Sequence, residues 1–231
     1  MADVRSTAAT SSRLFHGMSA TDSQAVLRAA AHRTLRKGDA LTRQGDPAAA
    51  FYLIERGYLK LTQLTAEGSE VIVRFVGPGD PVAGVAAIGE APYPVTALAC
   101  DAVVVLVWPR AILADLLARF PQLKTNILRE MTAHMENALT RLRELATLDV
   151  RQRLAHTLLR LTRAESTPPD GLERMVPHTL TRQELAELTG TTLFTVSRIL
   201  TEWEGAGIVH STRAHVAVLD AERLQDAAEG E

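Results

Sequence analysis

The chain has 231 residues, of which 46% are hydrophobic and 23% charged, the composition of an ordinary globular protein. At about 150 residues per domain, this length predicts one or two domains with buried cores. The formal net charge of −2 favours no particular partner. The one cysteine, Cys100, excludes a disulfide framework, a cysteine-based zinc site and a cysteine-ligated iron–sulfur cluster within one chain.

Neither the ends nor the apolar runs indicate a membrane protein. No apolar run approaches the roughly 20 residues that a membrane-spanning helix needs. Residues 1–13 are rich in Ala, Ser and Thr and lack the apolar stretch of a signal peptide. We therefore expect a cytoplasmic protein with no membrane contact, in which residues 1–12 form a flexible arm.

Residues 14 to about 115 predict a small β-domain. Glycines recur there beside Asp, Glu or Pro, and glycine permits the positive φ of tight turns. Short apolar runs, several of them rich in the β-branched residues that favour strands, lie between the glycines: Phe51–Ile54, Tyr58–Leu61, Val71–Val76 and Ala102–Trp108. This spacing predicts a sandwich, roll or barrel. A short helix over Ser23–His32, capped by Thr21 or Asp22, is expected before it.

Residues from about 110 to 148 predict helix, and no glycine or proline lies between Pro121 and Asp149. Apolar positions in this helix step by four and three residues, the pattern of a helix that packs against a like helix. A single helix packed on its own domain would show the same pattern. However, about 27 residues span roughly 40 Å, which is long for one small domain. We therefore expect a parallel homodimer with these residues at its interface: Met131, Met135, Ala138, Leu142 and Leu145.

The C-terminal part carries the most specific motif, at residues 180–200. Thr181 and Glu184 have the spacing of a capping box at a helix start. Gly190 can supply the turn after this helix, and Thr192 can cap a second one. Leu185 and Leu188 give the first helix an apolar side, and three residues do so for the second: Val196, Ile199 and Leu200. Helix, glycine turn and helix together predict a helix-turn-helix.

A helix-turn-helix places its second helix in the major groove of DNA. Residues 151–162 predict a preceding helix, residues 175–180 a possible strand, and residues 207–219 a following hairpin, or wing, with Arg213 near its tip. The candidate residues at the exposed start of the second helix are Leu193, Phe194, Thr195, Ser197 and Arg198.

Electrostatics limit how strongly this region can bind DNA without regard to sequence. Acidic residues outnumber arginines after residue 150, and lysine is absent there. Phosphate attraction supplies most sequence-independent affinity. A local basic surface made by Arg182, Arg198 and Arg213, doubled in a dimer, therefore predicts modest non-specific binding.

The chain as a whole, from about residue 13 to 226, resembles the CRP/FNR superfamily of bacterial transcription regulators. The N-terminal matches are 36–39 (RKGD), 43–46 (RQGD), 52–57 (YLIERG), 66–70 (AEGSE) and 77–80 (GPGD), and the C-terminal ones are 180–184 (LTRQE) and 196–200 (VSRIL). The resemblance implies an α+β fold: a cyclic-nucleotide-binding-type β-roll as effector domain (13–120), a long dimerisation helix (121–148) and a C-terminal winged helix-turn-helix (149–231). It also implies a homodimer that binds palindromic double-stranded promoter DNA and contacts RNA polymerase, as an activator.

The expected effector pocket departs from relatives that bind cyclic AMP. Those carry a glycine–glutamate pair for the ribose and an arginine before Ser/Thr-Ala for the phosphate. Here Gly84 is followed by Val85, and Val95 stands before Thr96. A pocket lacking both charged groups leaves the cyclic phosphate unpaired, which is costly. The sequence thus argues against cyclic AMP as the effector.

One branch of the family responds to nitrogen oxides, and residues 191–198 with Trp203 and Glu204 are similar to the recognition helices of that NnrR/DNR-like branch. This resemblance implies control by nitric oxide or redox state, with haem as the possible cofactor. His16 and His134 are conceivable axial ligands, but a surface role for His16 and an interface-flanking role for His134 are the favoured interpretations. Cys100 is either a redox thiol or a buried, inert one.

The resemblance to the CRP/FNR superfamily also suggests a role for each candidate DNA contact. Arg198 matches a residue that contacts guanine with two hydrogen bonds, whereas Phe194 replaces a glutamate that reads cytosine and could pack on a thymine methyl instead. Arg182 and Thr192 resemble phosphate contacts, and Gln183 could touch backbone or base.

Other function classes find less support. Catalysis lacks a nucleophile–base constellation, and residues 38–110 contain no histidine for a cupin-like metal site. The alternatives that stay open are a dimeric regulator without an effector, controlled by its abundance, and a regulator that binds another small molecule.

Overall fold

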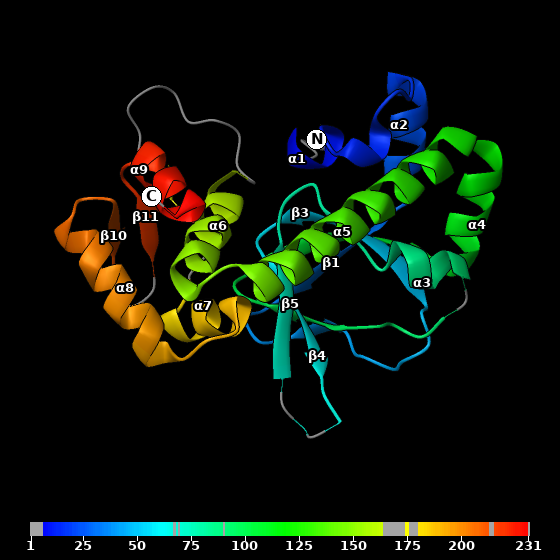
Figure 1. Ribbon diagram of the computed structural model, residues 1–231. Coiled ribbons are helices and arrows are strands. Elements are labelled where there is room, and N and C mark those ends of the chain that lie inside the picture. Colours follow the sequence, from blue (N-terminus) through cyan, green and yellow to red (C-terminus); the bar gives the residue numbers. More distant parts are fainter. Residues whose placement is uncertain are drawn as a thin grey trace. The chain divides into compact units, whose positions relative to one another are not determined.

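The computed structural model describes residues 7–66, 68, 70–89, 91–163, 174–175, 180–212 and 215–230. The chain forms two compact units, Met1–Asn137 and Ala138–Glu231 (Figure 1). Together they give a mixed α and β architecture, with the β-roll first and the helix-turn-helix second, as the sequence predicts.

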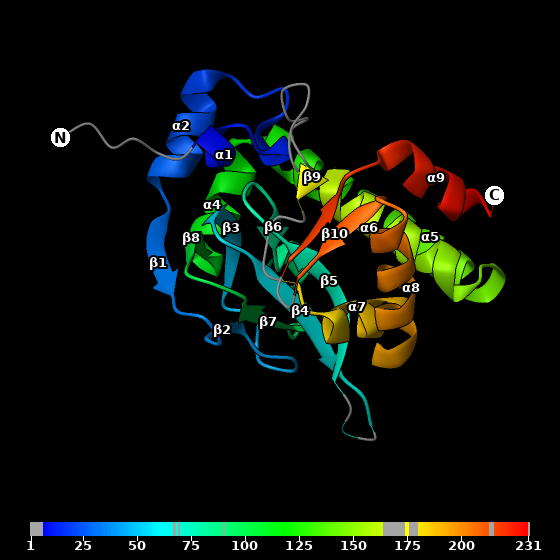
Figure 2. The ribbon, with the colours of Figure 1, turned by 90° about the vertical axis from the view of Figure 1, so that its left-hand side faces the viewer.

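The first unit is built on two four-stranded antiparallel sheets. One sheet has the order β1 (Ala31–Leu35), β8 (Val103–Pro109), β3 (Ala50–Arg56) and β6 (Pro81–Val82), and the other the order β2 (Ala40–Thr42), β7 (Thr96–Ala99), β4 (Leu59–Leu64) and β5 (Glu70–Val76). The four predicted apolar runs all lie in strands, namely β3, β4, β5 and β8. The β4–β5 hairpin projects from the roll, as Figure 1 and Figure 2 both show.

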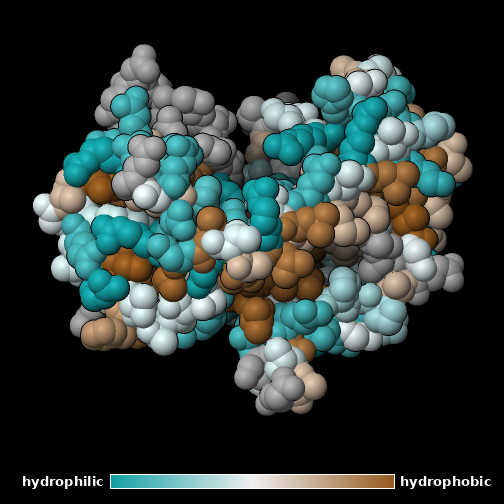
Figure 3. All heavy atoms as spheres, viewed as in Figure 1, coloured by the Kyte–Doolittle hydropathy of each residue, from teal (hydrophilic) through white to brown (hydrophobic). Residues whose placement is uncertain are grey.

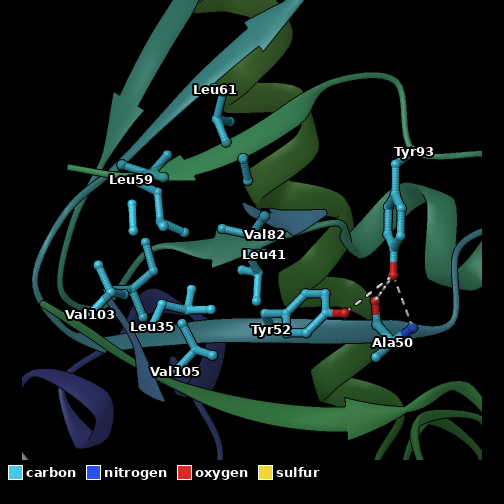
Figure 4. Close-up of a cluster of buried hydrophobic side chains, with 14 of the residues drawn as sticks. Leu35, Leu41, Ala50, Tyr52, Leu59, Leu61, Val82, Tyr93, Val103 and Val105 are labelled. Atoms are coloured by element: carbon cyan, nitrogen blue, oxygen red, sulfur yellow. Dashed lines mark hydrogen bonds between the residues drawn. The ribbon is translucent and has the colours of Figure 1, made fainter. Parts of the chain in front are cut away.

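The interior of the roll is an apolar cluster with two tyrosines. Figure 4 shows Tyr52 and Tyr93 with their hydroxyl groups directed toward each other and toward Ala50. The Tyr93 hydroxyl donates to the Ala50 carbonyl at 3.2 Å and accepts from the amide of Ala49 at 3.0 Å. Aliphatic side chains make up most of the rest of the cluster, including Leu59 and Val103, each with 0% of its surface exposed.

The short helix before the roll differs from the prediction. Helix α2 spans Ala20–Arg28 and is capped by Ser19, whose hydroxyl accepts from the amide of Asp22 at 3.0 Å. The prediction of a helix over residues 23–32 capped by Thr21 or Asp22 is therefore wrong at both ends. His32 lies in β1, where four of five residues are exposed, so the alternation expected of a half-buried strand is missing.

Residues 7–12, expected as part of a flexible arm, pack against the roll. Helix α1 (Thr7–Thr10) contains Ala9, which is fully buried, and the Ser12 hydroxyl donates to the Gly79 carbonyl at 2.6 Å. The following 3-10 turn, η1 (Arg13–Phe15), is tied to the long helix by the side-chain amide of Asn126. That amide donates to two carbonyls, of Leu14 and His16, each at 2.8 Å.

The helical region expected over residues 110–148 consists of two helices, α4 (Arg110–Arg119) and α5 (Pro121–Thr147). Phe120 separates them with φ −125° and ψ 79°, outside the helical region. Pro121 disfavours helical backbone at the residue before it and suits the first position of the next helix. A further helix, α3 (Gly84–Gly89), follows β6.

The second unit contains the end of α5, four further helices and a three-stranded sheet of order β10, β11, β9. Its elements are α6 (Val150–Arg163), β9 (Arg174–Met175), α7 (Arg182–Thr189), α8 (Leu193–Gly205), β10 (Val209–Ser211), β11 (Val216–Val218) and α9 (Ala221–Glu229). The sequence did not single out α9, which begins at an Asp220 cap and packs against α6.

Candidate nucleic-acid interface

Helices α7 and α8 form the predicted helix-turn-helix. The Thr181 hydroxyl accepts from the amide of Glu184 at 3.1 Å, and the Glu184 carboxylate accepts from the amide of Thr181 at 3.0 Å, so the predicted capping box is confirmed. Helix α7 ends at Gly190, which has φ 63° and ψ 45°. This left-handed conformation favours glycine. Thr192 then caps α8 by accepting from the amide of Thr195 at 3.2 Å.

One side of these helices is buried and fixes the orientation of α8. The side chains that form this core each have at most 9% of their surface exposed: Leu185, Leu188, Val196, Ile199, Leu200, Trp203 and Ile208. The opposite side of α8 presents Leu193, Phe194 and Arg198 to solvent, and Phe194 is 78% exposed. Water-exposed large apolar side chains grouped at one helix start indicate a binding surface.

A hollow of about 410 Å³ lies between the starts of α7 and α8 and the end of β10, lined by Thr181, Arg182, Gln183, Leu193, Ser211 and Thr212. Arg182 is held there because its Nη2 donates to the Ser211 hydroxyl at 2.8 Å. Gln183 is exposed and donates to Glu187 at 3.0 Å. The hollow thus brings together the predicted phosphate contact Arg182, the candidate contact Gln183 and the first residue of α8, whereas Thr192 is not part of its lining.

Three charged residues and an indole form a linked group on α6 and α8. Arg198 Nη1 donates to Glu202 Oε1 at 2.8 Å, and Arg151 Nη1 donates to Glu202 Oε2 at 2.6 Å. The Arg151 guanidinium carbon lies 5.6 Å from the centroid of the Trp203 ring. The hydrogen bond from Arg151 is the largest cause that lowers the pKa of the Glu202 carboxyl. Sequence reasoning missed Glu202, although its position four residues after Arg198 is a recognisable ion-pair spacing.

The predicted wing is present as the antiparallel hairpin β10–β11. Its candidate DNA contact, Arg213, lies outside the described residues. Next to the hairpin, Glu204 Oε1 accepts from the amide of Ser211 at 3.1 Å and lies 3.3 Å from Nδ1 of His210.

The residues predicted to line an effector pocket lie on α3 and at the start of β7 or directly before it. Gly84 opens α3, and a Cβ atom there would lie 3.1 Å from Ile127 Cγ2. Val95 is partly buried against the apolar cluster, and Thr96 Oγ1 accepts from the Gln44 amide at 3.0 Å. The side chain of Val85 lies outside the described residues.

The two candidate haem ligands, His16 and His134, are not part of a cluster of metal-binding side chains in the described residues. His16 is exposed just after η1, whereas His134 is partly buried on α5. Burial, together with the positive charges of Arg74 and Arg13, lowers the pKa of His134 to about 4. Within the described ranges, no three His, Cys, Asp or Glu side chains lie close enough to hold a metal ion. Cys100 is partly buried between β7 and β8.

Helix α5 presents an apolar face to solvent. On the face seen in Figure 3, apolar side chains gather over this helix. Met135, Leu142 and Leu145 from the predicted interface are 64%, 63% and 52% exposed, and Ala138 is also exposed. Met131 instead packs partly against the core of the first unit. Two residues outside the predicted set, Leu128 and Leu139, are exposed as well.

Comparison with known proteins assigns both units. A cyclic nucleotide-binding domain family matches residues 32–120, and a Crp-like helix-turn-helix family matches residues 152–227. The transcriptional activator protein anr of Pseudomonas aeruginosa is 33% identical over 105 residues, which are 46% of this chain and 43% of that relative. The match thus spans less than half of the relative's length.

Solved structures of other proteins share the fold. The catabolite activator protein of Thermus thermophilus is 28% identical, with a TM-score of 0.55 over 95% of this chain and 99% of that one. FixK2 from Bradyrhizobium japonicum, 22% identical, shares the fold with a TM-score of 0.73 over 86% of this chain and 96% of that one.

The fold and the interface therefore define a two-domain regulator that joins a cyclic-nucleotide-binding-type roll to a DNA-binding helix-turn-helix. The matched relatives are transcription regulators by name, among them the transcriptional activator protein anr. The chain belongs to the CRP/FNR family. In the part of the chain that the structure describes, none of the helices has the length and apolar character that crossing a membrane requires.

Proposed function

We propose that this chain works in the cytoplasm as a homodimer that binds palindromic promoter DNA and regulates transcription in response to an effector at the roll. The observation that carries the proposal is the division of α8 into two sides. Its inner side is buried, and its first residues expose Leu193, Phe194 and Arg198. A recognition helix needs this arrangement to reach base edges in the major groove.

The exposed apolar face of α5 supports the homodimer. Apolar positions 128, 135, 139, 142 and 145 are spaced by seven, four, three and three residues, and a second copy of the same helix offers the complementary surface. A two-fold dimer then places its recognition helices on half-sites about 34 Å apart, one turn of DNA.

Within each half-site, Arg198 makes the bidentate guanine contact and Phe194 packs on a thymine methyl. Arg182 and Thr192 contact phosphates, Gln183 contacts backbone or base, and Thr195 and Ser197 lie beside them. Arg213 of the wing adds a further phosphate contact. We also propose that the DNA-bound dimer contacts RNA polymerase and acts as an activator, in line with the printed name of the Pseudomonas aeruginosa relative.

A neutral or redox-active effector such as nitric oxide suits the roll better than a cyclic nucleotide, because Val85 and Val95 stand where relatives that bind cyclic AMP carry charged groups. If haem is the sensor, His16 and His134 are the first ligands to replace. An absorption spectrum of the purified protein with added haem, before and after reduction and nitric oxide, tests this directly. A stoichiometric Soret band that shifts on gas binding supports it, and lack of specific uptake contradicts it.

The tight packing of the roll also favours a second candidate, a dimeric regulator without an effector, controlled by its abundance. Gel shifts with and without nitric oxide, cyclic AMP and other small molecules separate the two: an effector-independent regulator gives the same affinity in every lane.

The proposed DNA binding is tested by selecting binding sites from random duplexes. We expect a two-fold sequence with half-sites one helical turn apart. A selection that returns an asymmetric site contradicts the dimer, and one that returns no preferred sequence contradicts the regulator.

A further inference from the structure

Glu202 occupies an unusual place for an acidic residue, because it lies on the helix that is proposed to enter a polyanion. Its two carboxylate oxygens accept from two different arginines, Arg198 on α8 and Arg151 on α6, at 2.8 and 2.6 Å. All three side chains are between 41% and 57% exposed, so the group is open to solvent. Its net charge is +1.

The second arginine limits the movement of Glu202. Arg151 lies against the ring of Trp203, which has only 1% of its surface exposed. This contact adds a cation–π attraction of the kind that Arg makes with Trp. The Glu202 carboxylate is therefore fixed to α6 through Arg151, which itself packs on the buried Trp203. Its hydrogen bond to Arg198 in turn restricts the orientation of the Arg198 guanidinium.

The hydrogen bond to Glu202 engages Nη1 of Arg198. A guanidinium has five N–H donors in a rigid plane, so donors remain for a bidentate contact with guanine. An arginine that is already oriented loses less side-chain entropy when it meets its base. The same carboxylate repels DNA phosphates, which weakens binding to every sequence alike.

We propose that Glu202 is the positioning residue of Arg198, which it orients for one G·C pair while suppressing sequence-independent binding. This inference rests on the proposed DNA-binding function. It predicts that Glu202 increases the ratio of specific to non-specific affinity, although its charge opposes binding.

The test measures the affinity of full-length variants by fluorescence anisotropy for three duplexes: the selected site, the site with the Arg198-dependent G·C pair replaced, and a scrambled sequence. For Glu202→Gln, whose single carbonyl oxygen cannot accept from both arginines in the same way, we expect the discrimination between the first two duplexes to fall about 3- to 10-fold. Binding to the scrambled duplex should tighten several-fold, and its salt dependence should become steeper.

Two variants separate position from charge. Glu222→Gln on α9 changes the net charge equally, and we expect it to keep the discrimination of the wild type. Glu202→Asp keeps the charge on a shorter side chain, so it should lose discrimination without tightening binding to scrambled DNA. In an Arg198→Ala background, Glu202→Gln should cause no further loss of discrimination. If discrimination is unchanged in Glu202→Gln, or falls equally in Glu222→Gln, the proposal is wrong.

Failure of this inference is distinguishable from failure of the DNA-binding function. A wild-type protein without sequence preference overturns the function, whereas a wild type that prefers a dyad while Glu202→Gln discriminates equally well overturns only the role of Glu202. Thermal unfolding monitors folding of each variant. If Glu202→Gln does not fold, Arg151→Ala provides the test, because it leaves α8 unchanged. This variant should also lower the discrimination, by a smaller factor than Glu202→Gln. Unchanged discrimination in Arg151→Ala would refute the anchoring of Glu202 by Arg151.

Discussion

The Glu144 carboxylate near the end of α5 accepts two hydrogen bonds from Nη1 of Arg160 on α6, at 2.6 Å to Oε1 and 2.8 Å to Oε2. Only 6% of Glu144 is exposed, so its charge depends on this partner. The Thr157 hydroxyl accepts from Nη2 of the same arginine at 3.1 Å. Within the second unit, the end of the long helix is thus fastened to the first helix of the DNA-binding domain.

The first prediction concerns this pair. Glu144→Ala leaves the Arg160 guanidinium without its buried partner and should lower the free energy of unfolding of the second unit by about 2 to 4 kcal/mol. Urea denaturation followed by circular dichroism measures the change. Glu136→Ala, at an exposed position on the same helix, is the matched control and should stay within about 0.5 kcal/mol of the wild type. Equal effects of both substitutions would show that the pair contributes nothing specific.

The second prediction concerns the α5 face. Leu142→Glu places a charge in the centre of the proposed dimer interface, where it would be buried without a partner, so the dimer should dissociate. Analytical ultracentrifugation should show a monomer at micromolar concentration and a dimer for the wild type. Arg143→Glu, one residue away, also introduces a carboxylate at an exposed position and should stay dimeric. A wild-type monomer at high concentration would refute the interface.

The third prediction concerns base reading. Arg198→Ala should weaken binding to the selected site by roughly 1 to 3 kcal/mol and relax the preference at one G·C position of each half-site. Site selection repeated with the variant measures both effects. An unchanged preferred sequence would show that Arg198 does not contact a base. By contrast, Arg182→Ala, which removes a phosphate contact, should weaken all sequences alike and reduce the salt slope.

The fourth prediction is a pH dependence. Since burial holds the pKa of His134 at about 4, below the 6.5 of a free histidine, the unfolded chain binds more protons than the folded one between these values. Stability should therefore be complete above pH 6.5 and fall as the pH drops toward 4, by less than the pKa shift alone would give because solvent screens this partly buried imidazole. His134→Gln should flatten this part of the curve. Unfolding at a series of pH values provides the measurement, and identical curves for the wild type and His134→Gln would contradict the burial argument.

The fifth prediction concerns the tyrosine pair of the roll. Tyr93→Phe removes the acceptor of the Ala49 and Ala50 amides and the donor to the Ala50 carbonyl, so buried polar groups lose a partner. The roll should lose about 1 to 3 kcal/mol of stability. Tyr58→Phe, at a tyrosine that lies less deeply, should cost less. Thermal unfolding of both variants measures the two losses of stability. If Tyr58→Phe cost more than Tyr93→Phe, the tyrosine pair would be dispensable.

The second unit could be predicted in more detail than the first, because its signals are local. The capping box at Thr181, the left-handed turn at Gly190 and the cap at Thr192 each involve residues within four positions of one another. The strands β3, β4, β5 and β8 were visible as apolar runs. Strand β1 was not, because it is mostly exposed and owes its place to pairing with β8, about 70 residues away.

Contacts between distant segments explain the remaining differences. Residues 7–12 read as a polar arm, yet Ser12 finds its partner at Gly79 and Ala9 is buried by the roll. Met131 fits the heptad pattern of the dimer face, yet it packs partly against the core of its own unit. Glu202 was overlooked because its role depends on Arg151, 51 residues earlier on a different helix.

The exposed apolar face of α5 has a consequence for gene control that needs no ligand. If monomers must pair before they bind an operator, mass action makes the concentration of competent protein rise with the square of total protein while monomers predominate. Promoter occupancy would then show a threshold in cellular abundance. Synthesis and degradation of the chain alone could turn its target genes on over a narrow range, with any effector acting by moving that threshold.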